Sequence, residues 1–383
     1  MPGLTIRIAP TLAAIDAAAW DACANPPGLP HDPFVSHAFL AALERSGSVG
    51  KRTGWSPAHV LVFEGERLAA AAPAYVKTHS LGEYVFDQTW ADAYERAGGS
   101  YYPKIQVAVP FTPVPGRRLL VAPDAPEGAR AALIEGLSVL RRTIGASSVH
   151  VTFTQEEDAA ALEAAGFARR TGAQYHFENP GYRDFEDFLD ALSSRKRKAI
   201  RRERREALAG GVEIDLLTGV QITSAHWDSF FSFYMDTGAR KWGRPYLTRA
   251  FFDEIGAAMA DRILLVMARR NGAHIAGAIN FLGGEAIYGR NWGALEDQPF
   301  LHFEVCYYQA MDYAIRHGYA RVEAGAQGEH KLARGYRPVP THSAHDIADP
   351  DFRAAVDAFL LRERVVVAEG LREDEEALPY RRA

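Results

Sequence analysis

A glycine-rich segment, residues 323–336, concentrates side chains that could do chemistry. It carries acidic, amide, imidazole and cationic candidates, namely Glu323, Gln327, Glu329, His330, Lys331 and Arg334. Gly325 and Gly328 allow a backbone to come close to a ligand and to turn N–H groups toward an anion or oxyanion. The two cations could bind a phosphate or a carboxylate. The segment therefore predicts a substrate-binding loop, with a salt-bridged glycine turn as the alternative.

A second group of candidates lies just upstream, at His302, Glu304 and Tyr307. Transfer of an acyl group to an amine needs a group that accepts a proton and a donor that stabilises the developing oxyanion. We therefore take Glu304, His302 and His330 as candidate bases and Tyr307 as a candidate substrate-binding residue. The alternative is that Glu304 only complements the helix dipole and that His302 caps the helix or packs.

A metal site is the weaker hypothesis for these residues. His330, His342 and His345, together with Glu304 or Glu323, could in principle ligate a metal ion. The sequence has no compact ligand motif such as His-Glu-x-x-His, and it has no nucleophile elbow. We therefore expect no metal ligands among the site residues.

The elements that must position these residues follow from hydrophobic periodicity. Residues 300–317 place Phe303, Tyr307, Ala310, Met311 and Ala314 on one apolar stripe, which predicts an amphipathic helix. Gly318 is the expected C-cap of this helix. A strand over 320–324 then delivers the glycine-rich segment.

Three strands are predicted before that helix, over 262–268, 273–282 and 286–293. The turns between them, Asn271-Gly272 and Gly283-Gly284, are typical of antiparallel hairpins. The order of three strands, helix and strand predicts an α/β fold with a mixed sheet. A weaker copy of this order occurs in the first half, with strands over 59–63, 68–76 and 149–154 and a helix near 127–142.

The two copies predict two domains, 1–179 and 180–383. The first contains an aromatic-rich insertion, residues 82–111, in which Glu83, Asp87 and Trp90 could bind a cationic amine through charge and cation–π contacts. The alternative is that Trp90 only fills the core between the two domains.

A basic helix, residues 193–208, begins the second domain after a serine N-cap signal. Arg197, Arg201 and Arg205 share one face and are the candidate anion-binding residues. Their charge needs an anionic partner to relieve self-repulsion, and tRNA, a nucleotide-linked precursor or an anionic membrane surface would serve. An ordinary solvated helix is the alternative.

Net charge, cysteine content and hydropathy limit the classes of protein to which this chain can belong. The net charge of -5 over 383 residues argues against a chain that binds nucleic acid over its whole surface. Two distant cysteines, Cys23 and Cys306, fit a reducing compartment better than a disulfide framework. The apolar runs are shorter than the roughly 20 residues that span a bilayer, and residues 1–19 lack a signal-peptide pattern. We expect a cytoplasmic protein of unknown oligomeric state, with peripheral membrane contact as an option.

Several motifs together resemble the FemAB-like family of peptidoglycan biosynthesis/recognition proteins. They are His302 to Gln309, Gly325 to Lys331 and Arg334 to Tyr336 in the second half, and Asp32 to Phe34, Pro73 to Lys77, His79 to Asp87, Tyr101 to Lys104 and Pro110 to Pro113 in the first. The resemblance spans about residues 30 to 365. It implies two tandem GNAT-type acyltransferase folds in a Fem-like architecture.

The resemblance implies an acyl- or aminoacyltransferase that acts on an amine acceptor, such as a cell-envelope or peptidoglycan-related precursor, in a cleft between the two domains. The co-substrate would be aminoacyl-tRNA or acyl-coenzyme A, with no tightly bound cofactor. The turn over 293–299 departs from the pyrophosphate loop of coenzyme A-dependent relatives, because Glu296 and Asp297 would repel a pyrophosphate. Two alternatives stay open: acyl-coenzyme A-dependent N-acyltransfer, and recognition of a peptide or peptidoglycan fragment without catalysis.

Overall fold

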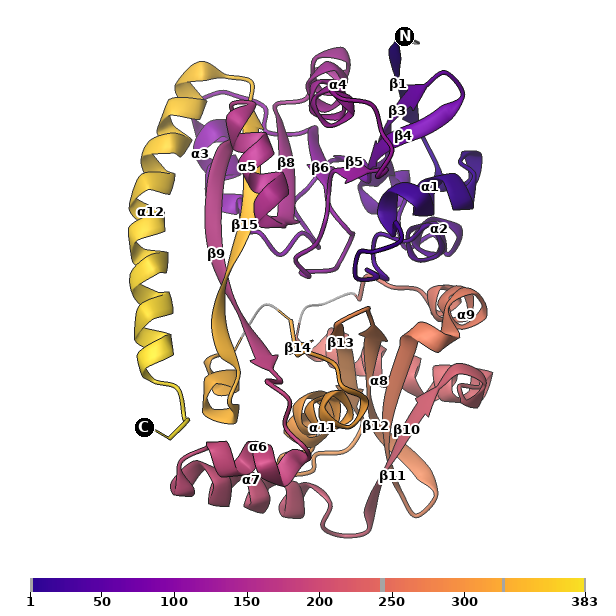
Figure 1. Cartoon of the computed structure of the whole chain (residues 1–383), viewed down its shortest axis with the longest axis vertical. Coiled ribbons are helices and arrows are strands. Elements are labelled where there is room, and N and C mark those ends of the chain that lie inside the picture. The colour runs from indigo at the N-terminus through magenta and orange to yellow at the C-terminus, as the bar shows by residue number, and fades with distance from the viewer. Residues whose placement is uncertain (1–2, 242–244, 326–327, 382–383) are drawn as a thin grey trace. The chain divides into compact units, whose positions relative to one another are not determined.

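The computed structural model describes residues 3–241, 245–325 and 328–381 (Figure 1). The chain forms two compact units, one of residues 1–172 and 340–369 and the other of residues 173–339 and 370–383. The sequence predicts one boundary, at 179/180, whereas the chain passes between the units three times. The predicted second domain, 180–383, thus includes residues 340–369, which belong to the first unit.

The first unit contains most of its elements before residue 165. Its strands are β1 (Leu4–Ala9), β2 (Trp55–Pro57), β3 (His59–Glu64), β4 (Arg67–Ala72), β5 (Ala74–Lys77), β6 (Lys104–Val107), β7 (Leu120–Val121) and β8 (Ser148–Thr154). Its helices are α1 (Ala17–Ala24), α2 (His37–Arg45), α3 (Gln88–Arg96), α4 (Ala129–Ile144) and α5 (Glu156–Ala164). The predicted strand over 68–76 is divided into β4 and β5 at Pro73, which has no N–H to give to a sheet.

The second unit contains the segment with the candidate residues. Its helices are α6 (Phe185–Ala191), α7 (Ser194–Ala207), α8 (Ser224–Lys241), α9 (Arg249–Ala258), α10 (Leu301–Phe303) and α11 (Gln309–His317), with a π-helical turn η5 (Glu304–Tyr308) and a 3-10 helix η6 (Glu329–Arg334). Its strands are β10 (Val212–Thr218), β11 (Ile263–Arg270), β12 (Ala273–Leu282), β13 (Ala286–Ala294) and β14 (Arg321–Glu323).

Three long elements run from one unit into the other along the chain. They are β9 (Ala168–Glu178), β15 (Arg337–Ile347) and α12 (Pro350–Glu376). In the first unit, β15 pairs antiparallel with β8, from His342 opposite Thr154 to Ile347 opposite Ser148. In the second unit, the end of β9 pairs antiparallel with β14. Both units are therefore completed by strands from distant parts of the sequence.

Parallel and antiparallel strand pairs occur in both units, as predicted for a mixed sheet. In the second unit β10, β11, β12 and β13 are successively antiparallel, and β13 then pairs in parallel with β14. In the first unit β8 pairs in parallel with β6, and β6, β5 and β2 continue antiparallel. A separate antiparallel sheet has the order β1, β3, β4, β7.

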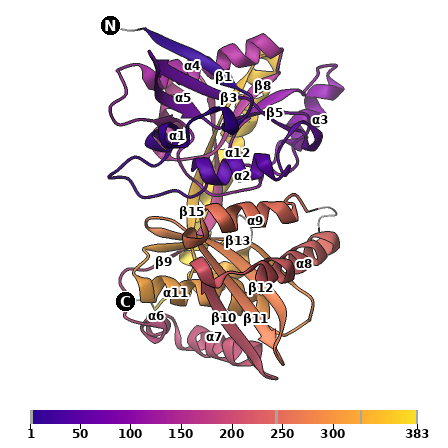
Figure 2. The same ribbon diagram turned by 90° about the vertical axis from the view of Figure 1, so that its right-hand side faces the viewer.

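Helices cover the sheet of the second unit on both faces. Helix α8 contacts β12 and β13, whereas α11 contacts β13 and β14, and Figure 2 shows the two helices on opposite sides of the strands. The main core of this unit lies under α11 and includes Leu264, Val266, Ile287, Met311 and Val322. None of the helices in the described part of the chain has the length and apolarity to cross a membrane.

Candidate functional site

The helix predicted over 300–317 carries a π-helical turn in its middle. It begins as α10, widens into η5 over Glu304–Tyr308 and continues as α11 to His317, with Gly318 at φ 72° as the C-cap. Turns of this kind are rare and frequently occur at functional sites, because the extra residue changes the direction of neighbouring side chains. The periodic sequence pattern predicts the helix and its end but does not reveal the wider turn.

Glu304, in this turn, is fully buried. Its Oε1 accepts hydrogen bonds from Arg204 Nη2 at 2.9 Å and from Gln309 Nε2 at 2.6 Å. The guanidinium carbon of Arg204 also lies 4.4 Å from the centre of the Phe185 ring. These contacts direct the carboxylate toward α7, where it anchors the basic helix. The assignment of Glu304 as a base stays a prediction, and its surroundings favour a structural role.

Arg334 is occupied by a second polar network. Its Nη2 donates to Glu203 Oε2 at 2.9 Å, and the Tyr308 hydroxyl donates to the same oxygen. Its Nη1 donates to the carbonyl of His330 at 2.7 Å. The guanidinium also lies over the ring of Phe303, 3.3 Å from the centroid. Arg334 therefore fixes η6 against α7 and α10, and the predicted anion-binding role would compete with these contacts.

His330, Tyr307 and His302 form an aromatic cluster that reaches the surface. The Tyr307 hydroxyl and His330 Nε2 are 2.9 Å apart, and the His330 side chain is exposed. The His302 ring centroid lies 5.3 Å from that of Tyr307 and 6.3 Å from that of His330. Burial raises the pKa of Tyr307 well above its usual range, so its hydroxyl keeps its proton. The Tyr307 hydroxyl thus orients the imidazole of His330 at the surface, where a ligand can reach it.

Lys331 holds the glycine-rich segment from inside. Its side chain is 1% exposed, and its Nζ donates to the carbonyl of Gly325 at 2.7 Å. Burial lowers the pKa of Lys331 to about 7, so the ammonium is poorly stabilised in this position. Gly325 has φ 79°, a left-handed conformation that favours glycine. An anion could bind Lys331 only by displacing this carbonyl, and the predicted role stays a prediction.

Glu323 meets a histidine that sequence reasoning missed. The register of β14 and β9 sets Glu323 opposite His176, and His176 Nε2 lies 3.7 Å from Glu323 Oε2. Arg321 Nε donates to Glu323 Oε1 at 2.8 Å. Burial raises the pKa of Glu323 and lowers that of His176 to about 3. The one sequence signal for His176 is its spacing of two residues from Gln174 in β9, because side chains at this spacing lie on the same face of a strand.

Two predicted residues of the segment lie wholly or in part outside the described part of the chain. Gln327 lies outside the described residues, as does the side chain of Glu329. Within the part of the chain that the structure describes, no three His, Cys, Asp or Glu side chains are grouped so that they could hold a metal ion.

The residues predicted in the insertion lie in the first unit. Glu83 and Asp87 meet there on Lys104, whose Nζ donates to Glu83 Oε2 at 2.7 Å and also to Asp87. Trp90 is buried and packs with its ring centroid 5.0 Å from that of His345. The two carboxylates thus already bind a cation of this chain. Trp90 lies in a core of the first unit, with Tyr101 and Ile347.

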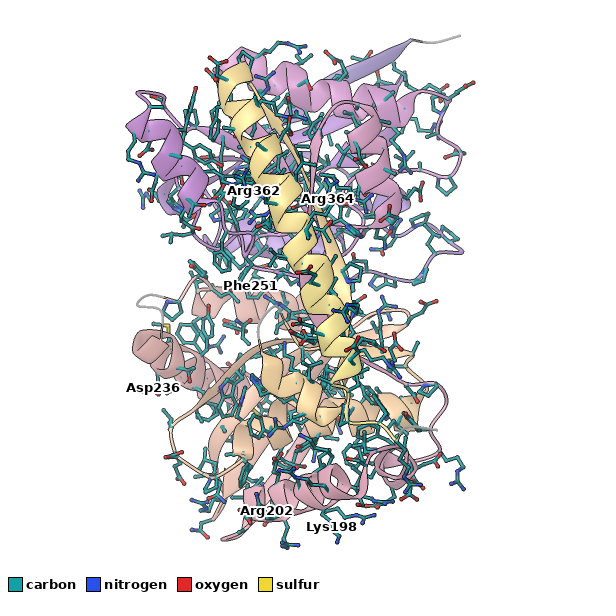
Figure 3. All side chains as sticks on the ribbon, turned by 90° about the vertical axis from the view of Figure 1, so that its left-hand side faces the viewer. Lys198, Arg202, Asp236, Phe251, Arg362 and Arg364 are labelled. Carbon is teal, nitrogen blue, oxygen red and sulfur yellow. The ribbon has the colours of Figure 1, made fainter. Side chains whose placement is uncertain are left out.

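The basic helix exists as α7, but its predicted arginines differ in their surroundings. Arg197 pairs with Asp190, and Arg201 pairs with Glu186, both from α6. Arg205 is exposed. Lys198 and Arg202 are also exposed on the outer side of α7 (Figure 3). Arg201 is exposed despite its ion pair, so the accessible cations include two predicted arginines, Arg201 and Arg205, together with Lys198 and Arg202.

Comparison with known proteins shows what this arrangement resembles. The model of the FemAB-like family, described as peptidoglycan biosynthesis/recognition, matches residues 11–382. No curated protein sequence matches the chain. The crystal structure of FemX is similar with 14% identity and a TM-score of 0.56, covering 90% of this chain and 98% of FemX.

Two further solved structures share the fold. The C-terminal domain of a putative lysylphosphatidylglycerol synthetase from Agrobacterium fabrum has 10% identity and a TM-score of 0.54, covering 92% of this chain and 97% of its own. The structure of L-PGS from Bacillus licheniformis has 12% identity and a TM-score of 0.50, covering 87% and 98%. At these identities the likeness concerns the fold. The predicted fold, α/β with mixed sheets in a Fem-like architecture, is confirmed.

Proposed function

The chain belongs to the FemAB-like family of peptidoglycan biosynthesis/recognition proteins, and from this premise we propose that it transfers an acyl or aminoacyl group to an amine. The observation that carries the proposal is the hydrogen bond between Tyr307 and His330, 2.9 Å long, beside His302. An exposed imidazole held by a hydroxyl is oriented to accept a proton from an attacking amine.

The chemistry assigns one role to each of these side chains. The amine nitrogen attacks the carbonyl carbon of the donor, and His330 accepts the proton that the amine loses. The C–O or C–S bond to the donor then breaks, and the same proton passes to the departing oxygen or sulfur. Tyr307 orients the imidazole, and His302 is the neighbouring second acceptor. Glu304 stays outside this sequence of steps, because its carboxylate binds Arg204.

The donor that we propose is aminoacyl-tRNA, with acyl-coenzyme A as the rival donor. The exposed cations of α7, Lys198, Arg202 and Arg205, support a polyanionic donor. The acceptor would be an amine of a cell-envelope precursor, which is the class that the family description suggests.

The test is a transfer assay with the purified chain, charged tRNA or acetyl-coenzyme A, and amine-bearing cell-envelope precursors. His330→Gln keeps a polar group near the Nε2 position but removes the imidazole, so turnover should fall by about 10² to 10⁴. Tyr307→Phe removes one neutral hydrogen bond, worth about 1 kcal/mol, and should lower turnover about fivefold.

His317→Gln is the matched control, because His317 is an exposed histidine at the end of α11. Unchanged turnover in His330→Gln would remove the base assignment. Binding of a precursor without transfer from either donor would instead favour the recognition protein.

A further inference from the structure

Two lysines face each other in the sheet of the first unit. Lys77 of β5 and Lys104 of β6 are direct register partners in an antiparallel pair, and both side chains are fully buried. Like charges directly opposite each other destabilise a sheet, and buried cations need partners. Two buried, facing lysines do not stabilise the sheet by packing alone. Their position is therefore better explained by the binding of an anionic group.

The anion that the lysines hold here comes from a surface loop. Glu83 Oε2 lies 2.7 Å from Lys104 Nζ, and Glu83 Oε1 lies 3.8 Å from Lys77 Nζ. One carboxylate thus faces both lysines, one oxygen toward each. Asp87, at the start of α3, also pairs with Lys104, and Ser80 Oγ accepts from the same ammonium at 2.9 Å.

The loop that delivers Glu83 is otherwise poorly packed. Within residues 81–86, all of which are described, Glu83 alone is buried. Leu81 and Phe86 are 57% and 59% exposed, although both are large and apolar. Tyr84 adopts φ 61°, a conformation that is uncommon for a residue with a side chain. Glu83 is therefore the only side chain among residues 81–86 that anchors the loop in the interior.

The backbone of the loop makes several further hydrogen bonds. The carbonyl of Gly82 accepts from the Phe111 amide at 3.2 Å, and the carbonyl of Phe86 accepts from Arg170 Nη1 at 2.8 Å. The carbonyl of Leu81 accepts from Trp55 Nε1 at 3.1 Å and from Lys77 Nζ at 3.3 Å. The Lys77 ammonium lies 3.7 Å from the centre of the Trp55 ring. Displacement of the loop would therefore release the ammonium of Lys77 and the face of Trp55 together.

We propose that Lys77 and Lys104 form a binding site for the carboxylate of a ligand, and that Glu83 occupies this site in the ligand's place. Binding displaces Glu83 and the loop 81–86 into solvent. The ligand class is a peptide or amino acid with a free carboxylate. This site is separate from the residues of the proposed transfer and does not depend on that function.

Charge balance favours a carboxylate over a phosphate. With Glu83 removed and both lysines protonated, Lys77, Lys104 and Asp87 carry one net positive charge, which one carboxylate neutralises and a phosphate dianion exceeds. One buried oxygen each of Glu83 and Asp87 has no hydrogen-bond partner, so the present arrangement satisfies the site incompletely. The carboxylates of Glu83 and of the ligand are chemically equivalent. The rest of the ligand must therefore supply the net gain on binding.

The test is calorimetric titration of the full chain with N-acetyl-Ala-Ala, which has a free carboxylate, and with its C-terminal amide. Wild type should bind the acid and not the amide. Glu83→Gln removes the internal competitor, and the acid should bind at least about tenfold more tightly, since charged hydrogen bonds are worth about 1.5–3 kcal/mol. Lys77→Met should abolish binding. Glu95→Gln, which removes an exposed carboxylate from α3, should behave as wild type.

Hydrogen exchange provides a readout that does not depend on affinity alone. The backbone amides of the loop 81–86 should exchange faster in Glu83→Gln and in wild type saturated with the acid. Equal binding of acid and amide, tighter binding of inorganic phosphate, or no binding by Glu83→Gln would each overturn the proposal. If Lys77→Met does not fold, as judged by thermal unfolding, the Glu83→Gln comparison still decides the matter.

Discussion

Arg204 and Glu304 form an ion pair of 2.9 Å that joins the basic helix to the π-helical turn. Glu304 is fully buried, and the side chain of Arg204 is 23% exposed. The pair therefore gives a structural reason for the carboxylate that the sequence pattern offers as a candidate base.

We predict that Glu304→Gln lowers stability rather than turnover. The substitution leaves the guanidinium of Arg204 without its charged partner, and the free energy of unfolding should fall by about 1–3 kcal/mol. Paired denaturant unfolding and transfer assays measure both effects. A loss of turnover by about 10² or more at unchanged stability would restore Glu304 as the base. Arg204→Gln and the double variant complete the cycle that isolates the pair.

The buried Lys331 makes stability depend on pH. Its pKa is about 7 in the folded protein, compared with 10.5 for an ordinary lysine in water. Between these values the unfolded chain binds more protons, so stability rises with pH through that window. Below about pH 7 both states are protonated, the slope vanishes, and the destabilisation from the buried charge is complete. Lys331→Met should remove up to about 1.4 kcal/mol per pH unit of this slope.

The measurement is denaturant unfolding of wild type and Lys331→Met from pH 6.5 to 9.5. Lys77, whose pKa burial also lowers to about 7, is present in both proteins and cancels in the difference. Lys198→Met, at an exposed position on α7, is the control and should not change the slope. A slope that Lys331→Met leaves unchanged would show that its ammonium stays charged in the fold.

The outer side of α7 should control affinity for a polyanion. Replacing Lys198 and Arg202 with Gln removes two exposed charges, and the slope of log affinity against log salt for tRNA should fall by about 1.5. Filter binding across salt concentrations gives this slope. Lys51→Gln with Arg52→Gln, at two exposed cations of the first unit, is the matched control. If the salt slope fell as much in the control as in the α7 variant, tRNA would be attracted by the overall charge of the protein alone.

The same assay compares arginines that differ in how closely they are paired. Arg197 and Arg201 make close ion pairs with carboxylates of α6, whereas Arg202 lies 3.7 Å from Glu206, so replacing Arg197 and Arg201 should affect the salt slope less than replacing Lys198 and Arg202. The sequence shows that these residues share a helix, but it does not show which of them α6 neutralises.

Local patterns predicted the elements well. The strand expected over 273–282 is β12 with the same bounds, and the basic helix expected over 193–208 is α7 over Ser194–Ala207. Alternation, hairpin glycines and a serine cap are local signals, and they are sufficient for such elements. Partners distant in sequence are not encoded locally. For this reason, three long-range contacts could not be predicted from the sequence. They are the pairing of β15 with β8, the contact of Glu304 with Arg204 and the approach of His176 to Glu323.

A fragment of residues 1–179 should not fold, although the sequence suggests it as a domain. It lacks the part of β15 that pairs with β8, and it lacks Ile347, Val356 and Leu360, which pack with Trp90 and Tyr101 in the core. Circular dichroism and hydrogen exchange should show an incompletely structured chain. A cooperative unfolding transition like that of the full protein would contradict this prediction. A fragment that covers 1–172 joined by a flexible linker to 340–369 is the control and should be the better folded of the two.

The late return of β15 has a consequence for how the protein is made. A ribosome synthesises β8 nearly two hundred residues before the strand that covers its edge, because β8 ends at Thr154 and its partner in β15 begins at His342. The unit that is translated first therefore cannot finish folding first, as amino-terminal domains usually do. While the middle of the chain is translated, the nascent protein exposes one edge of β8 and the apolar residues that α12 later covers. Chaperones that bind nascent chains at the ribosome should therefore stay bound to this chain longer than to a chain whose units are contiguous. The yield of folded protein should depend on the concentration of these chaperones.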